Sequence, residues 1–393
     1  MKILIICPYP KGKAPSQRFR FEQYLDLLDL EFDEVSFWKE DEWPKIYERG
    51  SVVFKVYRTI GGFLRRFYLL FRLVKYKKIF IHREATPIGP PWFEWLAVRF
   101  LKKEVIYDFD DSIWLPNSSD ANRKIAGKFK NHTKAGKICS WASICVVGNE
   151  FLAEYARQYC ADVRIIPTTI DTDTYHNRKL YKRSLGKWRK QADYPSINIK
   201  KVVNKPAEKG ANEIDIAKKR KLTIGWTGTH STLKQLIPLF TVLNELHDHE
   251  PFRFLLIADK APPKLPKFVE FRKWKKESEI EDLLEIDIGV MPLFDTEWEK
   301  GKCGFKALQY MALEIPTVLS EVGVNIEISE SGKAAYLGES LPLKSVSDWK
   351  ESLLELIKEK PLRKKLGALG REVVDKKYSV KSQIESYRSV FKD

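Results

Sequence analysis

Two short stretches in the second half of the sequence carry residues suited to hold an anion. The first spans 222–234, where an apolar run meets a turn rich in Gly, Thr and Ser. Ser231 or Thr232 could cap a helix there, and a helix start presents free N–H groups and partial positive charge to a phosphate. A plain strand–helix turn with a capping hydroxyl explains the same pattern. The candidate contacts are Gly228, Thr229, His230, Ser231, Thr232 and Lys234.

The second stretch is Gly-Lys-Cys-Gly-Phe-Lys at 301–306. Lys302 and Lys306 are four residues apart, so on a helix both ammonium groups can face one anion. The helix dipole disfavours cationic side chains near a helix start. Two lysines at this position therefore indicate that an anionic ligand is held there. A solvated basic face is the alternative.

In the first half, three carboxylates lie at or just after the end of an expected strand at 104–108: Asp108, Asp110 and Asp111. Strand geometry would point Asp108 and Asp110 one way and Asp111 the other. Asp108 could bind a hydroxyl group of a ligand or help with a proton. Three carboxylates also allow a metal site, and helix capping with turn formation is the simpler alternative.

Further polar residues follow two other candidate strands. His82 and Glu84 end one of them and could face a shared site, although a single His is more often structural. Arg18 and Arg20 lie two apart after the first strand. Guanidinium groups suit phosphate or pyrophosphate, but a solvated surface position is equally compatible with each.

Short apolar, β-branched runs alternate with longer amphipathic stretches along the chain, which predicts parallel sheets covered on both faces. Such sheets bind ligands at the carboxyl ends of their strands. The expected strands are 2–7, 34–38, 78–82, 104–108, 144–147 and 163–166, then 222–226, 253–258, 268–272, 287–291 and 317–320. Among the expected helices are 16–28, 92–101, 233–247, 305–313 and 380–391.

The alternating pattern occurs twice, so we expect an α/β chain with two doubly wound parallel-sheet domains. The expected divisions are a first domain at 1–171, a basic insert at 172–221 and a second domain at 222–378. A C-terminal helix at 379–393 could pack back on the first domain. The insert is long for a linker.

The composition excludes several classes of protein. At 393 residues and 44% hydrophobic, the chain can bury a sizeable core. No uncharged run reaches the ~18 apolar residues of a membrane span, and the first apolar run is too short for a secretory signal. Five cysteines without a Cys-x-x-Cys pair argue against a disulfide scaffold or cysteine zinc site and fit the cytosol.

The net charge of +16 is concentrated in two segments. Residues 176–221 hold 15 Lys and Arg against four acids, and residues 54–80 hold eight with no acid. A local excess of this kind indicates a polyanionic partner.

The segment 60–78 is also aromatic and amphipathic. It could be a domain helix packing its apolar side on the sheet, or an interfacial helix on an anionic membrane, or both. Nucleic acid is the remaining polyanion, but no nucleic-acid-binding motif is present.

Several motifs, in order, resemble bacterial GT-B glycosyltransferases of the retaining, family-4 type. Gly-Lys-Cys-Gly-x-Lys-x-Leu-Gln-Tyr-Met-Ala followed by Ile-Pro-Thr-Val-x-Ser-x-Val-Gly-x-Asn-x-Glu is similar to their donor-binding region. Similar segments are 224–232, Ile-Pro-Thr-Thr-Ile-Asp at 166–171, Pro-Ser-Gln-Arg-Phe-Arg at 15–20, His-Arg-Glu at 82–84 and Val-Ile-Tyr-Asp-Phe-Asp-Asp at 105–111.

The resemblance implies two Rossmann-like domains facing a cleft, with donor on the second and acceptor on the first. Residues 225–234 with Lys302 and Lys306 would hold the diphosphate. Gln309 would lie near the ribose, and Asn325 and Glu327 near the end of the donor pocket. Asp108 matches the place of an active-site His in many members.

The sequence departs from the family at one pair of positions. Gly301 and Gln309 occupy the places of two family glutamates. Gln309 can still hydrogen-bond a ribose hydroxyl, whereas the contact to the donor sugar would have to come from Asp295, Glu297 or Glu299.

The resemblance implies transfer of a sugar from a nucleotide diphosphate-sugar, with UDP favoured, to a cell-surface glycan or lipid-linked acceptor such as a capsule or lipopolysaccharide precursor. It implies retention at the anomeric carbon, no metal or other cofactor, and a cytoplasmic enzyme peripheral on the inner face of the membrane through 54–80 and 176–221. Nucleic acid is not expected as a partner. The alternatives are a nucleotide-sugar epimerase, a non-catalytic GT-B-like binding protein and a nucleic-acid binder.

Overall fold

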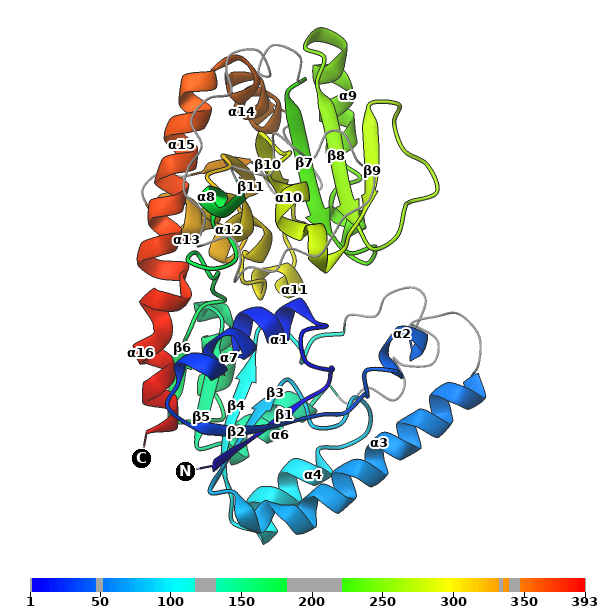
Figure 1. The fold of residues 1–393 in the computed structure, drawn as a ribbon, viewed down its shortest axis with the longest axis vertical. Coiled ribbons are helices and arrows are strands. Elements are labelled where there is room, and N and C mark those ends of the chain that lie inside the picture. Colours follow the sequence, from blue (N-terminus) through cyan, green and yellow to red (C-terminus); the bar gives the residue numbers. More distant parts are fainter. Residues whose placement is uncertain are drawn as a thin grey trace, which may run out of the picture.

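The computed structural model describes residues 2–46, 52–116, 132–181, 221–331, 335–338 and 347–392. Two parallel six-stranded sheets lie one beyond the other along the molecule, each flanked by helices (Figure 1). Most of the predicted basic insert, residues 182–220, lies outside the described residues.

The first sheet has the order β2-β1-β3-β4-β5-β6, and every neighbouring pair is parallel. Its central strands are buried along their length, which matches their continuous apolar sequences. The strands are β1 (Lys2–Cys7), β2 (Glu31–Ser36), β3 (Lys78–His82), β4 (Glu104–Phe109), β5 (Ile144–Val147) and β6 (Val163–Ile165).

The second sheet has the order β12-β11-β10-β7-β8-β9, again entirely parallel. The predicted fold class, two Rossmann-like doubly wound domains, is confirmed. The short edge strand β12 was not predicted. The strands are β7 (Thr223–Gly228), β8 (Arg253–Ala258), β9 (Val269–Lys273), β10 (Ile288–Met291), β11 (Thr317–Ser320) and β12 (Tyr336–Gly338).

Helices cover both faces of each sheet. In the first half they are α1 (Pro15–Arg20), η1 (Glu22–Leu27), α2 (Trp43–Ile46), α3 (Val52–Arg72), η2 (Leu73–Lys75), α4 (Trp92–Trp95), η3 (Leu96–Phe100), α6 (Lys134–Trp141), α7 (Glu150–Arg157) and α8 (Arg178–Tyr181). In the second half they are η6 (Leu233–Gln235), α9 (Leu239–His249), η7 (Lys276–Ser278), α10 (Glu279–Leu283), α11 (Glu297–Lys300), α12 (Phe305–Ala312), α13 (Val324–Glu330), α14 (Ser347–Lys358), α15 (Lys360–Val373), η8 (Val374–Tyr378) and α16 (Val380–Phe391). No described helix is long and apolar enough to cross a membrane.

Two predicted helices are divided. The segment predicted as one helix at 16–28 forms α1 and the 3-10 helix η1, with a break at Phe21. The helix predicted at 233–247 starts as the 3-10 turn η6, and the α-helix begins only after Pro238. Proline has no backbone N–H to give to a preceding turn, so a helix continues poorly through it and starts readily from it.

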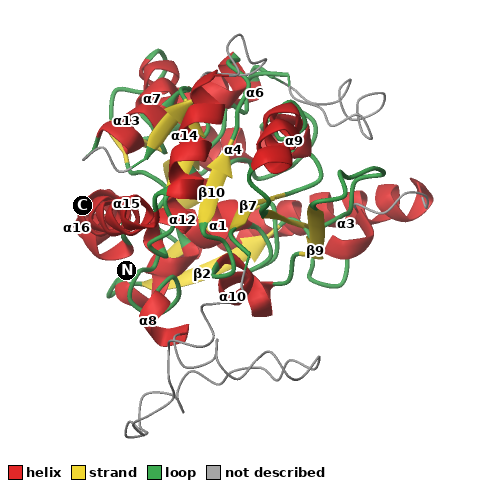
Figure 2. Ribbon diagram, turned by 90° about the horizontal axis from the view of Figure 1, so that it is seen from above, coloured by secondary structure: helices red, strands yellow, loops and turns green. Residues whose placement is uncertain are grey.

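Helix α16 continues the column of α15 and returns from the second domain to the first sheet (Figure 1). Seen from above, α15 and α16 overlap (Figure 2). Ser379 caps it by accepting a hydrogen bond from the Ser382 N–H at 3.0 Å. The ring of Tyr387 stacks on Tyr24 with centroids 4.0 Å apart, and its hydroxyl donates to the Arg20 carbonyl. The C-terminal helix is therefore part of the first domain's core.

The chain passes between the domains at one place in both directions. Ile170 donates its N–H to the Tyr378 carbonyl at 2.8 Å, and Val380 donates to the Ile170 carbonyl at 3.1 Å. The outgoing and returning segments thus form a short parallel bridge.

Replacing Tyr387 by Ala should lower the free energy of unfolding by about 3–5 kcal/mol, because a buried ring is lost from between α16 and the sheet. Tyr387→Phe removes only the hydroxyl and should cost about 1 kcal/mol. Urea unfolding measures both. Equal losses for the two variants would contradict the packing role of the ring.

Candidate active site

Asp108, at the end of β4, is fully buried between two cationic or polar partners. One carboxylate oxygen lies 2.5 Å from Arg20 Nη2 and the other 2.6 Å from His82 Nδ1. Burial alone would raise the pKa of Asp108, but Arg20 and His82 outweigh it, and the net shift is downward. Both oxygens are thus committed, and Asp108 holds His82 in place.

Arg20 and His82 are themselves fully buried. Arg20 also donates to the Ile166 carbonyl, which ties α1 to the end of β6. His82 turns its Nε2 toward the Ser16 hydroxyl, 3.5 Å away. The sequence motifs containing Arg20, His82 and Asp108 therefore meet in one place at the carboxyl edge of the first sheet.

A second ionic cluster follows directly. Arg83 has a positive φ of 61° and donates from Nη1 to Asp110 at 3.2 Å and to Asp111 at 2.9 Å. The prediction that Asp110 and Asp111 point in opposite directions is wrong. Strand β4 ends at Phe109, so alternation no longer applies, and both carboxylates turn toward one guanidinium.

Asp111 also reaches the second domain, where its carboxylate lies 2.7 Å from Lys302 Nζ. Burial alone would raise the pKa of Asp111, but Lys302 and Arg83 lower it to about 2. For Lys302, burial lowers the pKa and Asp111 raises it, with a net increase. Lys302 is therefore occupied by a carboxylate of the opposite domain.

Lys306 lies in the first turn of α12, after Gly304 in the left-handed conformation with φ 66°. Lys302 precedes the helix, so the two lysines are not one turn apart on it as predicted; they are nevertheless near enough to affect each other electrostatically. Within the described residues Lys306 has no ion-pair partner and sits 5.7 Å from the Trp226 ring centre. Burial and, secondarily, Lys302 lower its pKa to about 8.

The segment 228–234 forms a tight turn after β7. The Thr229 N–H donates to the Thr232 hydroxyl at 3.2 Å, and the Thr229 and Ser231 hydroxyls are 2.8 Å apart. Because an α-helix begins only at Leu239, the predicted helix start at this turn is wrong. Lys234 points outward from η6 and is exposed.

His230 lies on the same turn and pairs with Asp259, which was not among the predicted site residues. Its N–H and Nδ1 are each 2.6 Å from a carboxylate oxygen of Asp259, directly after β8. Gly228 ends β7 against the Trp226 ring, where a larger residue would collide.

Two predicted donor contacts are committed to internal partners. Glu299 is buried in α11; Gln235 donates to it at 2.5 Å, and the Thr296 hydroxyl donates to its other oxygen. Gln309, in α12, has its amide nitrogen 3.2 Å from His176 Nε2.

Asn325 and Glu327 lie in α13. The Asn325 amide donates to the Ser320 carbonyl at 3.1 Å, while its Oδ1 is buried on the side of Gly304 and has no hydrogen-bond partner among the described residues. Glu327 is exposed and accepts the Tyr378 hydroxyl at 3.2 Å.

Gly301 lies where the two domains touch. A side chain there would overlap Ser112 of the first domain. This position therefore has no room for the glutamate that stands here in the glycosyltransferases that the sequence resembles. Asn149 Nδ2 donates to the Lys302 carbonyl at 3.0 Å, and Cys303 Sγ lies 3.3 Å from the Asp110 carbonyl. The loop before α12 is thus held directly against the first domain.

Arg18 is also used between the domains. Its guanidinium lies 3.1 Å from Glu279, whose carboxylate also accepts the Tyr175 hydroxyl at 2.8 Å. The neighbouring Phe19 ring is 4.3 Å from Phe305, centre to centre.

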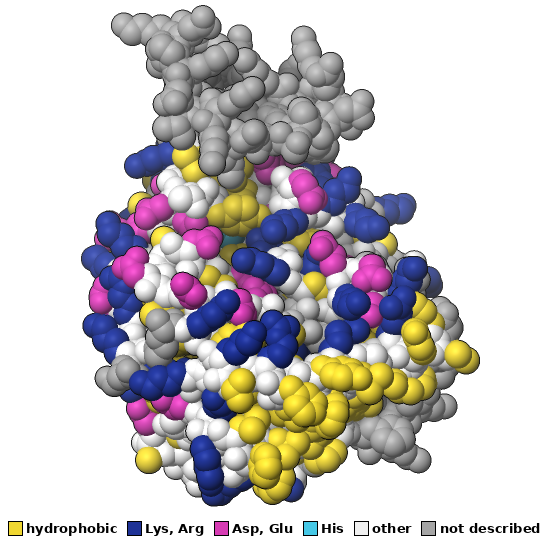
Figure 3. Space-filling model, turned by 60° about the horizontal axis from the view of Figure 1, so that its bottom comes forward, with side chains coloured by type: hydrophobic (Ala, Val, Ile, Leu, Met, Phe, Trp, Pro, Cys, Tyr) yellow, Lys and Arg dark blue, Asp and Glu magenta, His cyan; other side chains and the backbone are white. Residues whose placement is uncertain are grey.

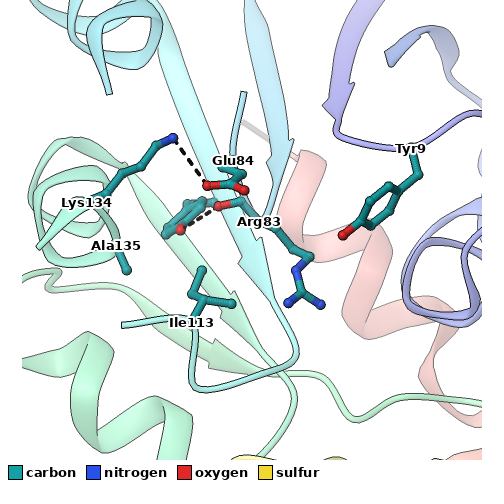
Figure 4. A pocket seen from close by; sticks show the side chains of 7 residues that line it. Tyr9, Arg83, Glu84, Ile113, Lys134 and Ala135 are labelled. Atoms are coloured by element: carbon teal, nitrogen blue, oxygen red, sulfur yellow. Dashed lines mark hydrogen bonds and ion pairs between the residues drawn. The ribbon is translucent and has the colours of Figure 1, made fainter. Parts of the chain in front are cut away.

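A polar pocket opens beside these clusters in the first domain (Figure 4). Glu84 reaches across it to the Lys134 ammonium, 3.2 Å away, while Arg83 and Tyr9 approach from the other side. Its walls come from the ends of β3 and β4, the loop after β1 and the start of α6: Tyr9, Arg83, Glu84, Tyr107, Ile113, Lys134 and Ala135. Such a pocket suits a ligand rich in hydroxyls or negative charge.

Four residues of the clusters and the pocket described above were not among the predicted site residues. Tyr9, Arg83 and Lys134 line the pocket, and Asp259 binds His230. Arg83 and Asp259 each follow the last residue of a parallel strand, which is the signal that identified Asp108. Nothing in the local sequence distinguishes Lys134 or Tyr9. Within the described ranges no group of three His, Cys, Asp or Glu side chains is placed to hold a metal.

If Lys306 holds the anion, as the sequence motif predicts, pyrophosphate binding should weaken above pH 8, because only the protonated ammonium attracts an anion and its pKa lies at about 8. We expect up to about a tenfold loss per pH unit beyond that point, relative to Lys306→Arg, which stays charged. Calorimetric titration between pH 7 and 9.5 measures both. Parallel pH profiles for the two proteins would contradict this role.

Asp111→Asn should strengthen pyrophosphate binding, because it releases Lys302 for the ligand. A partly buried ion pair of this kind corresponds to roughly a 2–10-fold change in affinity. Glu385→Gln is the control, since it removes an exposed carboxylate of α16 that pairs with Arg388 away from the site. Weaker binding by Asp111→Asn would show that Asp111 does not compete with the anion.

No family model and no curated protein matches the sequence. Solved structures do match over nearly the whole chain. Sucrose-phosphate synthase from Thermosynechococcus elongatus has a TM-score of 0.69 at 13% identity, covering 100% of this chain and 99% of that one. A glycosyltransferase from Rickettsia africae has 0.64 at 14% identity, covering 100% and 98%. HepE from Anabaena, in complex with UDP and glucose, has 0.66 at 13% identity, covering 99% and 98%. The chain thus has the GT-B fold of these glycosyltransferases.

Proposed function

We propose that the protein is a glycosyltransferase that moves a sugar from a nucleotide diphosphate-sugar to a glycan or lipid-linked acceptor. The observation that carries the proposal is Lys306, a half-buried cation without an ion-pair partner in the described part of the chain, at the start of α12 beside Lys302. UDP is the favoured nucleotide, supported by HepE, whose structure contains UDP and glucose.

The chemistry follows from charge development. When the sugar leaves, negative charge grows on the diphosphate, and cations placed beforehand stabilise it most. The N–H groups at the start of α12 and the Lys306 ammonium would meet that charge. Lys302 would join them by giving up Asp111. No metal is needed in this scheme, because these cations perform its task.

On the first domain, we assign the acceptor to the pocket of Arg83, Glu84 and Lys134. Asp108 would act through His82, which it holds by a 2.6 Å hydrogen bond. Contact between the domains would exclude water, which otherwise hydrolyses the donor. Transfer with retention of the anomeric configuration, as in family-4 enzymes, is part of the proposal.

A cell-surface glycan, such as a capsule or lipopolysaccharide precursor, is the acceptor class we favour. A lipid-linked acceptor would bring the enzyme to the inner face of the cell membrane. The exposed amphipathic helix α3 supports such a peripheral position. The other basic segment proposed for this contact, 176–221, lies mostly outside the described residues.

A second candidate is a GT-B-like protein that binds nucleotide without turnover. The supporting observation is Gly301, whose place beside Ser112 leaves no room for a glutamate.

The test uses the full chain with UDP-, GDP- and dTDP-linked sugars, with and without Mg²⁺ and with a membrane extract as acceptor source. Thermal unfolding reports binding, and release of free nucleotide reports turnover. Stabilisation and release with one nucleotide family support the transferase. Stabilisation without release under any condition supports the binding protein, and no stabilisation contradicts both.

Lys306→Ala should lower the rate of nucleotide release by ~30–1000-fold, equivalent to about 2–4 kcal/mol of transition-state stabilisation. Lys300→Ala is the matched control, because Lys300 ends α11 directly before the loop and pairs with the exposed Glu297. A loss of less than threefold for Lys306→Ala would rule out contact with the leaving phosphate.

A further inference from the structure

Helix α3 carries two opposite apolar faces, and one of them is uncovered. At 100° per residue, Val53, Ile60, Leu64, Phe67 and Phe71, continued by Val74 of η2, fall within an arc of roughly 80°. All six side chains are exposed, from 49% for Phe67 to 83% for Val53. The side of the helix that looks away from the domain is therefore a continuous apolar stripe.

The opposite side holds the helix to the domain. Leu69 and Leu73 enter the core, and Gly62 lies against the Phe37 ring, where a side chain would collide. Arg66 is fully buried and donates to the carbonyls of Cys7 at 2.8 Å and Ala85 at 2.7 Å. The exposed stripe thus does not arise from a helix loosely attached to the protein.

A surface helix ordinarily has one apolar side, which packs inward, whereas this helix has a second apolar side that faces outward. One cation, Arg66, points to the core, whereas Phe67 and Phe71 point out. Burying cationic side chains while exposing rings is unfavourable in water unless something apolar covers the rings.

The charges that this segment itself contributes have one sign, although two of them, Arg58 and Arg65, are paired with the buried Glu42. The sequence from Val52 to Phe80 contains no Asp or Glu. Arg72 and Lys75 are exposed at the C-terminal end of the stripe. On the neighbouring elements α4 and η3, Trp95 and Phe100 expose two further rings, with the exposed Arg99 beside them.

Figure 3 shows the apolar side chains gathered in one band across this face, with Lys and Arg along its border. The face lies on the first domain, away from the second (Figure 1). An apolar band with a basic border matches the two layers of an anionic lipid surface, acyl chains and phosphate headgroups.

We propose that this face, α3 with Trp95 and Phe100, inserts into the interface of an anionic lipid bilayer and orients the first domain on it. A second copy of the chain is a poorer occupant, because a two-fold contact would place the same cations against each other. The proposal rests on the membrane position included in the proposed function and assigns it to a named face, but its test measures lipid binding and needs no enzymatic activity.

The attachment of α3 gives the docked molecule a fixed orientation. Arg66 binds the carbonyls of Cys7, at the end of β1, and of Ala85, after β3, the same strand ends that lead to Tyr9 and Arg83. A lipid surface on α3 would therefore hold the polar pocket at a defined height above it, and leave the second domain clear of the surface.

The test is co-sedimentation of the full chain with vesicles of phosphatidylglycerol and phosphatidylcholine, and with vesicles of phosphatidylcholine alone. The variant Phe67→Gln/Phe71→Gln removes two exposed rings and keeps helix-forming residues. Ile237→Gln is the matched control, because Ile237 is equally exposed (58%) on the second domain. Thermal unfolding verifies that each variant is folded, and Arg72→Gln/Lys75→Gln tests the charge separately.

We expect wild type and Ile237→Gln to bind the anionic vesicles alike, at least tenfold more tightly than neutral ones, and the ring variant to lose at least tenfold. The charge variant should lose affinity for anionic vesicles only. Absence of wild-type binding, or equal binding by the ring variant, would overturn the proposal. A concentration-dependent dimer in sedimentation velocity, abolished by the ring variant with vesicle binding unchanged, would assign the face to a second copy.

Discussion

The buried contact of Asp108 with Arg20 and His82 is the interaction on which the candidate site depends. Three segments distant in sequence meet there, and the same Arg20 binds the end of β6 through one group and receives α16 through another. A buried carboxylate without its partners would be strongly unfavourable, so any arrangement that separates these segments is penalised. One ion cluster thereby fixes the carboxyl edge of the first sheet, the entry of α1 and the position of the C-terminal helix.

Among the described residues around Lys302, three cationic side chains, Lys302, Arg83 and Lys306, share two carboxylates, Asp110 and Asp111. Lys302 takes Asp111, Arg83 shares Asp110 and Asp111, and Lys306 is left with a pKa of about 8. A diphosphate can complete this set, whereas a neutral ligand cannot. The close approach of Gly301 to Ser112 brings the loop that carries Lys302 within reach of Asp111. The absence of a side chain at Gly301 and the ionic contact of Lys302 with Asp111 are therefore two aspects of one packing arrangement.

The sheets were readily predicted, because their strands are short, buried and apolar: 2–7, 78–82, 144–147, 253–258 and 317–320 match the observed strands residue for residue. The turn at 228–234 was harder, since its sequence suits a helix start and only Pro238 reveals that the helix begins later. Partners such as Asp259 for His230, or Glu279 for Arg18, could not be found from the sequence. They depend on how strand ends and domains are placed in space, and no local pattern encodes that placement.

The bridge of Ile170 with Tyr378 and Val380 restricts how the two domains can turn relative to each other. A single connection would let the second domain swivel freely, but two chain segments hydrogen-bonded side by side resist twisting. Bending about that bridge is the domain motion that these two segments oppose least. Because α16 is anchored in the first domain's core, such bending would move the second domain away from the first, and the ion pair of Asp111 with Lys302 is among the contacts that would part.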